Sequence, residues 1–322
     1  MTLPVFDAGE RAPRCSDSAR AQGTRMLGSA GRYPAFLLVH WPLPWPRDVG
    51  DIDELASVTA LAGSIGARVQ LLQPAQSESE QDGGAPRAML YAASDPFAGY
   101  RRFELARAEP TVVDDALALL AGAGTPAEGD VLDILVCAHG SRDVCCGSLG
   151  SRLLGELPAE PSAGVRWWRT SHTGGHRFAP TAITFPDGMV WGRLDARLLQ
   201  LVARRDDGVA DLAGHIRGCS GLRSAGAQVV DAEAFQTYGW DWLRLPRTDR
   251  TDGDRVEIVA TTPDGSRVSC SADVTEGRRV PQLPCRGPIG EVTKWDVELE
   301  LADYRCGPVE PEGDGRRRGS GR

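Results

Sequence analysis

The sequence predicts an α/β protein made of two tandem units and a small antiparallel β appendage. Three observations predict this class. Strand-like apolar runs alternate with helical periodicity in residues 31–125, the same order of elements returns in residues 130–245, and alternating strands follow in residues 250–308. The length of 322 residues and a hydrophobic content of 41% fit two domains with an appendage and exclude a wholly disordered chain.

The first unit is expected to have the order β-α-β-β-β-α. The expected strands cover residues 35–39, 67–72, 87–92 and 101–105, and the expected helices cover 51–65 and 111–121. Pro42, Pro44 and Pro46 end the first strand, because proline has no backbone donor for a ladder. A β-α-β run implies two parallel strands with a right-handed crossover, and the following strands are then antiparallel.

The second unit repeats this order after a Gly/Ala/Pro linker at residues 122–129. Its expected strands cover residues 131–137, 165–169, 181–185 and 189–194, and its expected helices cover 147–157 and 195–204, with a further helix at 224–237. Pro186, Asp187 and Gly188 form the turn of a hairpin. A β-α-β unit followed by a hairpin and a helix is the thioredoxin-type arrangement, so two tandem thioredoxin-like units are expected.

The two ends of the chain have a different composition. Residues 1–30 are polar and without periodicity, which predicts an N-terminal loop segment. The appendage is expected to have strands at 256–260, 268–274 and 294–301. The tail at residues 309–322 is rich in Gly and Arg and is predicted to be disordered.

Charge and composition exclude several classes of partner. The net charge of −8, from 36 basic and 44 acidic residues, argues against nucleic acid. No apolar run approaches the roughly 18 residues of a membrane helix, and no secretory signal precedes the first unit, so no membrane is expected and the predicted location is cytoplasmic. Eight cysteines beside five histidines then indicate metal or redox chemistry sooner than disulfides.

Two cysteines and two histidines of the second unit form the candidate site. Cys137 ends the first strand of that unit, and Cys146 opens its first helix. His172 and His176 follow the second strand, with two glycines between them that allow a tight turn. Two thiolates and two imidazoles suit tetrahedral zinc or a [2Fe–2S] cluster with histidines on one iron and cysteines on the other.

Two segments around these residues resemble a known family. Residues 136–147, VCAHGSRDVCCG, resemble the cysteine motif of the sucrase/ferredoxin-like proteins, and residues 171–179, SHTGGHRFA, are similar to their HxxxH motif. Three further segments resemble the bacterial members of this family: Cys15-Ser16-Asp17, residues 43–46 and Arg217-Gly218-Cys219. The resemblance covers roughly residues 13–240.

This resemblance implies a ferredoxin-like thioredoxin fold in the second unit, with a [2Fe–2S] cluster. The implied ligands are Cys137, Cys146, His172 and His176. Cys145 departs from the family pattern, so an exchange of ligand between Cys145 and Cys146 stays open, with Cys146 preferred because it matches the motif.

The other residues near the candidate site, and the remaining cysteines, are expected to have mainly structural roles. His139 is either a hydrogen-bond donor near the cluster or a solvent-facing loop residue, and Arg142 and Asp143 are expected to pair with each other. The remaining cysteines are expected to be buried free thiols, with a Cys270–Cys285 pair as an alternative; they are Cys15, Cys219, Cys270, Cys285 and Cys306. The first unit contains His40 and no cysteine, which predicts a role in packing, homodimer formation or partner docking.

The sequence therefore predicts an electron-transfer or redox-sensing protein with one [2Fe–2S] cluster. Its partner would be a reductase or an electron acceptor. Two alternatives stay open: a thiol–disulfide oxidoreductase that uses Cys145 with Cys146 or Cys137, and a structural zinc site on an interaction module. No motif indicates a nucleotide site or the carboxylate pair of a glycosidase.

Overall fold

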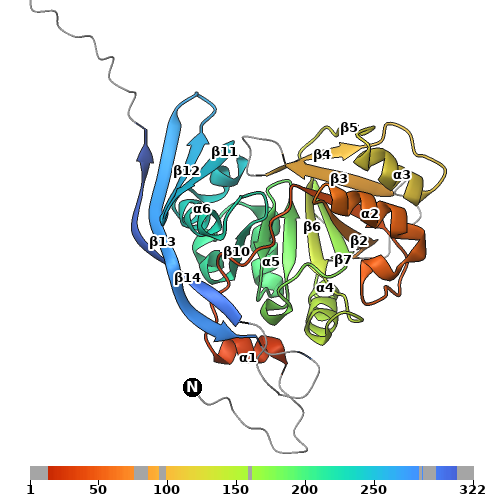
Figure 1. Ribbon diagram of the computed structural model, residues 1–322, viewed down its shortest axis with the longest axis horizontal. Coiled ribbons are helices and arrows are strands. Elements are labelled where there is room, and N and C mark those ends of the chain that lie inside the picture. Colours follow the sequence, from red (N-terminus) through yellow and green to blue (C-terminus); the bar gives the residue numbers. More distant parts are fainter. Residues whose placement is uncertain are drawn as a thin grey trace, which may run out of the picture.

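The computed structural model describes residues 14–75, 86–93, 99–158, 162–282, 285 and 295–309. Within these residues the main body is one mixed sheet of ten strands, in the order β10-β9-β8-β6-β7-β2-β1-β3-β4-β5. A second sheet has the order β11-β12-β13-β14 and lies to one side of the main body (Figure 1). The predicted α/β class and the separate C-terminal antiparallel sheet are confirmed.

The first half of the large sheet contains β1 to β4. These strands are β1 (Ala35–His40), β2 (Arg68–Pro74), β3 (Ala88–Ala93) and β4 (Tyr100–Glu104). β1 is parallel to β2 and antiparallel to β3, which is antiparallel to β4. Helix α3 (Val112–Leu120) begins at Thr111, whose side chain accepts a hydrogen bond from the Asp114 amide.

The helix predicted over residues 51–65 is shorter than expected. It divides into two 3₁₀ turns, η1 (Val49–Asp51) and η2 (Asp53–Leu55), and helix α2 (Ala56–Ser64). Ile52 separates the two turns because its backbone is extended, with φ −95° and ψ 105°.

The second half repeats the strand order and directions of the first. Its strands are β6 (Leu132–Cys137), β7 (Val165–Thr170), β8 (Ala182–Phe185) and β9 (Met189–Trp191), and its helices are η3 (Cys146–Gly150), α4 (Ser151–Gly155) and α5 (Ala196–Arg204). β6 is parallel to β7 and antiparallel to β8, which is antiparallel to β9. β2 pairs with β7, so the two halves share one continuous sheet.

Three elements in or next to the large sheet are absent from the sequence prediction. α1 (Cys15–Ala21) lies where a loop is expected, β5 (Thr125–Pro126) lies in the linker, and β10 (Ile216–Cys219) extends the sheet beyond β9. α1 packs against η4 (His176–Phe178) and buries Cys15, Ser16 and Ala19. Its burial depends on residues far along the chain, so helical periodicity within residues 15–21 gives no sign of it.

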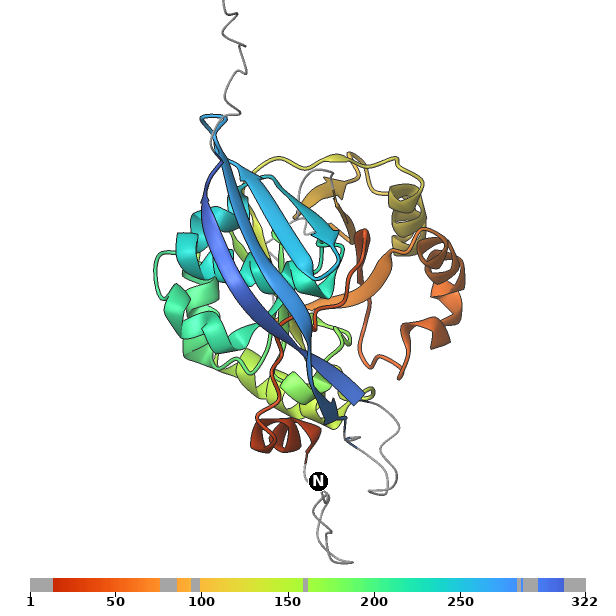
Figure 2. The same cartoon turned by 60° about the vertical axis from the view of Figure 1, so that its left-hand side comes forward.

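The C-terminal sheet is fully antiparallel. It consists of β11 (Arg247–Asp252), β12 (Arg255–Thr261), β13 (Arg267–Pro281) and β14 (Trp295–Pro308), and α6 (Ala225–Tyr238) packs against it. A 3₁₀ segment, η6 (Gly239–Arg244), leads from α6 to the sheet, and another, η5 (Val209–His215), precedes β10. The long β13 and β14 run down the left side of the main body in Figure 1 and cross in front of it in Figure 2.

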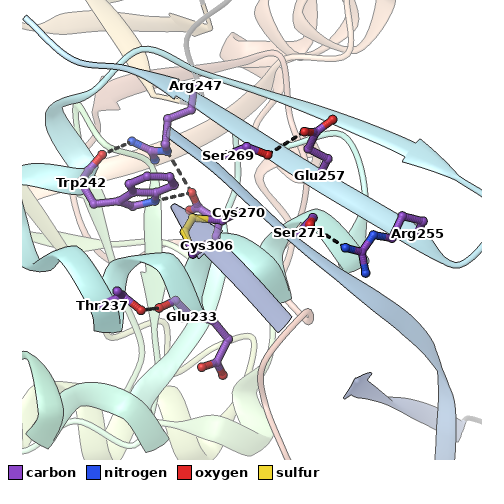
Figure 3. The surroundings of a disulfide bond; sticks show 11 residues. Glu233, Thr237, Trp242, Arg247, Arg255, Glu257, Ser269, Cys270, Ser271 and Cys306 are labelled. Carbon is purple, nitrogen blue, oxygen red and sulfur yellow. Dashed lines mark hydrogen bonds and ion pairs between the residues drawn. A yellow bond between two sulfur atoms is a disulfide. The ribbon is translucent and has the colours of Figure 1, made fainter. Parts of the chain in front are cut away.

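Cys270 and Cys306 form a disulfide across β13 and β14. The prediction of free thiols is therefore wrong for these two residues, and so is the alternative Cys270–Cys285 pair. The register of the two strands places Cys270 directly opposite Cys306. Trp242 and Arg247 lie beside this disulfide (Figure 3).

The predicted C-terminal tail lies outside the described residues except for Val309. Among the helices that the structure describes, none has the length and apolar content needed to cross a bilayer.

Candidate metal centre

Cys137 and Cys146 face each other where the second half of the sheet meets its first helix. Cys137 is the last residue of β6, and Cys146 is the first residue of η3, a π-helical turn. Their exposed fractions are 0% and 1%. One ligand atom from each lies within 4.8 Å of the other and of a ring nitrogen of His172, and Cys146 Sγ is 3.8 Å from His172 Nδ1.

Glycines allow the cysteine loop to lie directly against the strand end. A Cβ atom at Gly150 would lie 1.9 Å from the carbonyl oxygen of Cys137, and one at Gly147 would lie 2.4 Å from Gly140 Cα. These neighbours are backbone atoms, which cannot move aside as a flexible side chain can. The glycines therefore fix the distance between Cys137 and the turn that carries Cys146.

Replacement of Gly150 by alanine tests this packing. We expect Gly150→Ala to lower the free energy of unfolding by at least about 1–3 kcal/mol, because the new methyl group overlaps the Cys137 carbonyl. Urea unfolding measures the change. Gly155→Ala is the matched control, since no atom lies within 4 Å of a Cβ there, and equal stability of the two variants would contradict the prediction.

The two histidines lie on the loop after β7, and a buried arginine holds that loop. Gly174 and Gly175 have φ values of 83° and 70°, a conformation that favours glycine. Arg217 Nη1 donates to the Gly174 carbonyl at 2.9 Å, and a Cβ at Gly175 would lie 2.5 Å from Arg217 Cζ. Arg217 therefore positions the turn that separates His172 from His176.

The structure brings three of the four predicted site residues together and places the fourth beside them. The ring centroids of His172 and His176 are 6.0 Å apart. His176 Nδ1 lies 3.0 Å from Asp143 Oδ2 and 2.9 Å from Cys15 Sγ. His176 thus belongs to a neighbouring group that also contains Asp143, Cys15 and Cys285.

The neighbouring cysteines Cys145 and Cys146 face different groups. Cys146 faces Cys137 and His172, whereas Cys145 Sγ lies 3.5 Å from Cys15 Sγ and 3.0 Å from Cys285 Sγ. Hydrogen bonds from Cys15 and Cys285 hold the pKa of the Cys145 thiol well below its usual range. Cys145 and Cys146, although adjacent in the chain, therefore belong to two separate groups of side chains.

The electrostatics of the first group favour a bound cation. The hydrogen bond from Cys146 holds the pKa of the Cys137 thiol well below its usual range, and the same bond raises the pKa of Cys146. The lowered pKa of Cys137 favours the thiolate form that a metal ion requires. Burial lowers the pKa of Arg217 to about 10, while the charges of Cys146 and Cys137 act in the opposite direction and favour its cationic form.

His139 contacts the site from a buried position. Its Nδ1 accepts a hydrogen bond from the His172 amide at 3.1 Å, and its Nε2 donates to the Pro46 carbonyl at 2.7 Å. The exposed fraction of His139 is 2%, so the solvent-facing alternative is wrong. His139 links the segment around Pro46 to the backbone of a predicted ligand.

The expected Arg142–Asp143 pair does not form. Arg142 forms an ion pair with Asp48, and Asp143 faces His176. Although burial by itself raises the pKa of the Asp143 carboxyl, the hydrogen bond and charge of His176 lower it overall. Sequence spacing could not show this choice, because Asp48 is distant in the chain and reaches Arg142 only through the fold.

The sequence did not predict that Cys15 and Cys285 lie together in one group of side chains. Their Sγ atoms are 2.8 Å apart although 270 positions separate them in the chain. Neither has a ligand-like neighbour at a short spacing. The one available signal was the cysteine count, which exceeded the number of proposed ligands.

The predicted ligands lie within the part of the chain that matches a known protein family. The family model described as sucrase/ferredoxin-like matches residues 26–215. Altered inheritance of mitochondria protein 32 from Meyerozyma guilliermondii is 38% identical over 66 residues, which cover 18% of this chain and 23% of that protein. The match thus spans about a quarter of this relative. No solved structure matches the chain.

Proposed function

Because this chain belongs to the sucrase/ferredoxin-like family, we propose that it binds a [2Fe–2S] cluster and transfers or senses single electrons. The proposed ligands are Cys137, Cys146, His172 and His176. The observation that carries the proposal is the pair of buried thiols at the end of β6 and the start of η3, with a histidine nitrogen within 4.8 Å of both.

The donor set fits such a cluster. Two cysteines suit one iron and two histidines suit the other, as in clusters with mixed ligation. The contact of His176 Nδ1 with Asp143 leaves Nε2 of that ring for iron. A carboxylate on the second nitrogen orients a ligating histidine and raises its basicity, which is the role we propose for Asp143.

When bound, the cluster supplies reversible one-electron chemistry. Neutral histidine ligands leave less negative charge on it than four thiolates would, which raises the reduction potential. Arg217 adds a buried positive charge and holds the histidine loop through Gly174. Burial of Cys137 and Cys146 excludes water from the thiolate side of the site.

We further propose that the two halves of the large sheet are thioredoxin-like units. The orders β2-β1-β3-β4 and β7-β6-β8-β9 support this, because each has one parallel pair followed by antiparallel strands. The first half carries no cysteine and serves as the packing partner of the half that holds the site.

The reduction potential should depend on pH. Oxidised iron withdraws more charge from a ligating imidazole, so the free ring nitrogen loses its proton more readily in the oxidised state. Above that pKa the potential should fall by up to about 59 mV per pH unit for one proton coupled to one electron. A dye-mediated titration between about pH 6 and 9 measures the slope. A flat potential over this range contradicts histidine ligation.

Anaerobic purification tests the proposed cofactor. The expected result is a brown protein whose visible bands bleach with dithionite, with iron and acid-labile sulfide in equal amounts and an electron paramagnetic resonance (EPR) signal after reduction. A colourless protein whose predicted ligands hold zinc in place of iron would contradict the proposal and support the structural zinc alternative.

A further inference from the structure

Three sulfur atoms from distant parts of the chain meet next to the proposed cluster site. Cys15 belongs to α1, Cys145 directly precedes η3, and Cys285 follows β13. The Sγ distances are 2.8 Å for Cys15–Cys285, 3.0 Å for Cys145–Cys285 and 3.5 Å for Cys15–Cys145. The exposed fractions of Cys15 and Cys145 are 2% and 0%. We call these three residues the trithiol group.

A carboxylate completes this group. Asp143 Oδ1 accepts hydrogen bonds from Cys285 Sγ at 3.2 Å and from the Cys145 amide at 2.8 Å. Asp143 is 7% exposed, and its other oxygen faces His176. Three thiols and an oxygen donor therefore converge from three segments, in a place where an unpaired carboxylate would be costly.

We propose that the trithiol group binds a zinc ion, with Asp143 as the fourth donor. Structural zinc sites are tetrahedral and rich in cysteine, carboxylate oxygen is among the ligands that zinc accepts, and soft sulfur ligands favour zinc over magnesium or calcium. A disulfide uses only two sulfurs and leaves the third beside the carboxylate, whereas one ion uses all four donors.

This zinc site is separate from the proposed cluster. Its four proposed donors do not include Cys137, Cys146, His172 or His176, although Asp143 and Cys15 both contact His176 Nδ1. Cys15 and Cys285 also lie outside residues 26–215, the part of the chain that the family model matches. The zinc site thus combines Asp143 and Cys145, which lie inside that match, with two cysteines that lie outside it.

The ion joins both ends of the chain to the cysteine loop. α1 lies under the lower ends of β13 and β14 in both views of the ribbon (Figures 1 and 2). Zinc at the trithiol group would connect Cys15 in α1 and Cys285 to Cys145, which immediately precedes Cys146. The order of the cluster loop therefore depends on the ion, and metal binding contributes to folding stability.

The test measures zinc and iron in the full chain, produced with both metals supplied and purified anaerobically. The expected result is one zinc per chain in addition to the iron. Cys15→Ser and Cys285→Ser should reduce zinc to background and keep iron, whereas Cys137→Ser should lose iron and keep zinc. Cys219→Ala removes a buried thiol elsewhere and should keep both metals.

A second measurement tests the site even if some of these variants fold poorly. Cobalt(II) added to the zinc-free chain should produce sulfur-to-cobalt charge-transfer absorption in the near ultraviolet, in proportion to the number of thiolates. In a Cys137→Ser/Cys146→Ser background, which removes the thiolates of the proposed cluster site, the intensity should correspond to three thiolates, and adding Cys285→Ser should leave about two-thirds of it.

The outcomes separate this inference from the proposed function. Iron without zinc overturns the zinc site and leaves the cluster proposal intact, and zinc without iron does the reverse. Zinc that stays bound in both Cys15→Ser and Cys285→Ser overturns the site. A Cys15–Cys285 disulfide in the protein as purified, found by peptide mapping without reductant, also overturns it.

Discussion

Cys137→Ser should remove the iron from this protein and leave its fold in place. Cys137 lies at the buried end of β6, and its thiolate is one of two proposed sulfur ligands to the same iron. A serine hydroxyl is a much poorer ligand for iron than a thiolate, because it keeps its proton at neutral pH. The visible bands and the EPR signal of the reduced protein should therefore be lost, while far-ultraviolet circular dichroism stays unchanged.

Two control variants make this result specific. Cys219→Ala removes another fully buried thiol, whose Sγ contacts the Asp187 carbonyl, and should retain the visible bands. Cys145→Ser decides between the adjacent cysteines, since Cys145 lies with Cys15 and Cys285. Loss of iron in Cys145→Ser with retention in Cys146→Ser would contradict the proposed ligand set.

Asp231→Ala should destabilise the protein by about 3–5 kcal/mol. Asp231 in α6 accepts hydrogen bonds from Arg247 Nε at 2.9 Å and from Trp242 Nε1 at 2.8 Å. The side chains of Arg247 and Asp231 are 0% and 1% exposed, so the substitution leaves a buried guanidinium without its counter-charge. Arg247 begins β11, and the C-terminal sheet would lose one attachment to the main body.

Urea unfolding measures this effect. The matched control is Asp211→Ala, which breaks the exposed Arg197–Asp211 ion pair and should barely change the midpoint, because water and salt screen that pair. Equal midpoints for Asp231→Ala and Asp211→Ala would contradict the structural role of the buried pair.

The sequence predicts most of the main body because its signals are local. Apolar runs at residues 35–39 and 131–137 become β1 and β6, and Cys137 and Cys146 lie at the predicted strand end and helix start. The repeated order of elements is also visible in the sequence. The pairing of β2 with β7, which joins the two halves into one sheet, has no local signal.

The remaining features depend on contacts between distant residues. The disulfide follows from the register of β13 against β14, and a different register would separate Cys270 from Cys306. α1 is a short helix whose buried residues pack against η4, far along the chain. The trithiol group likewise forms only when both ends of the chain meet the cysteine loop, so residue spacing could not predict it.

Pulsed EPR of the reduced protein can decide whether His172 and His176 bind the cluster, because it detects nitrogen nuclei bound to iron. We expect strong couplings from two imidazole nitrogens, one of which disappears in His172→Cys and the other in His176→Cys. A [2Fe–2S] signal without strongly coupled nitrogen would contradict the assignment of these two histidines as ligands.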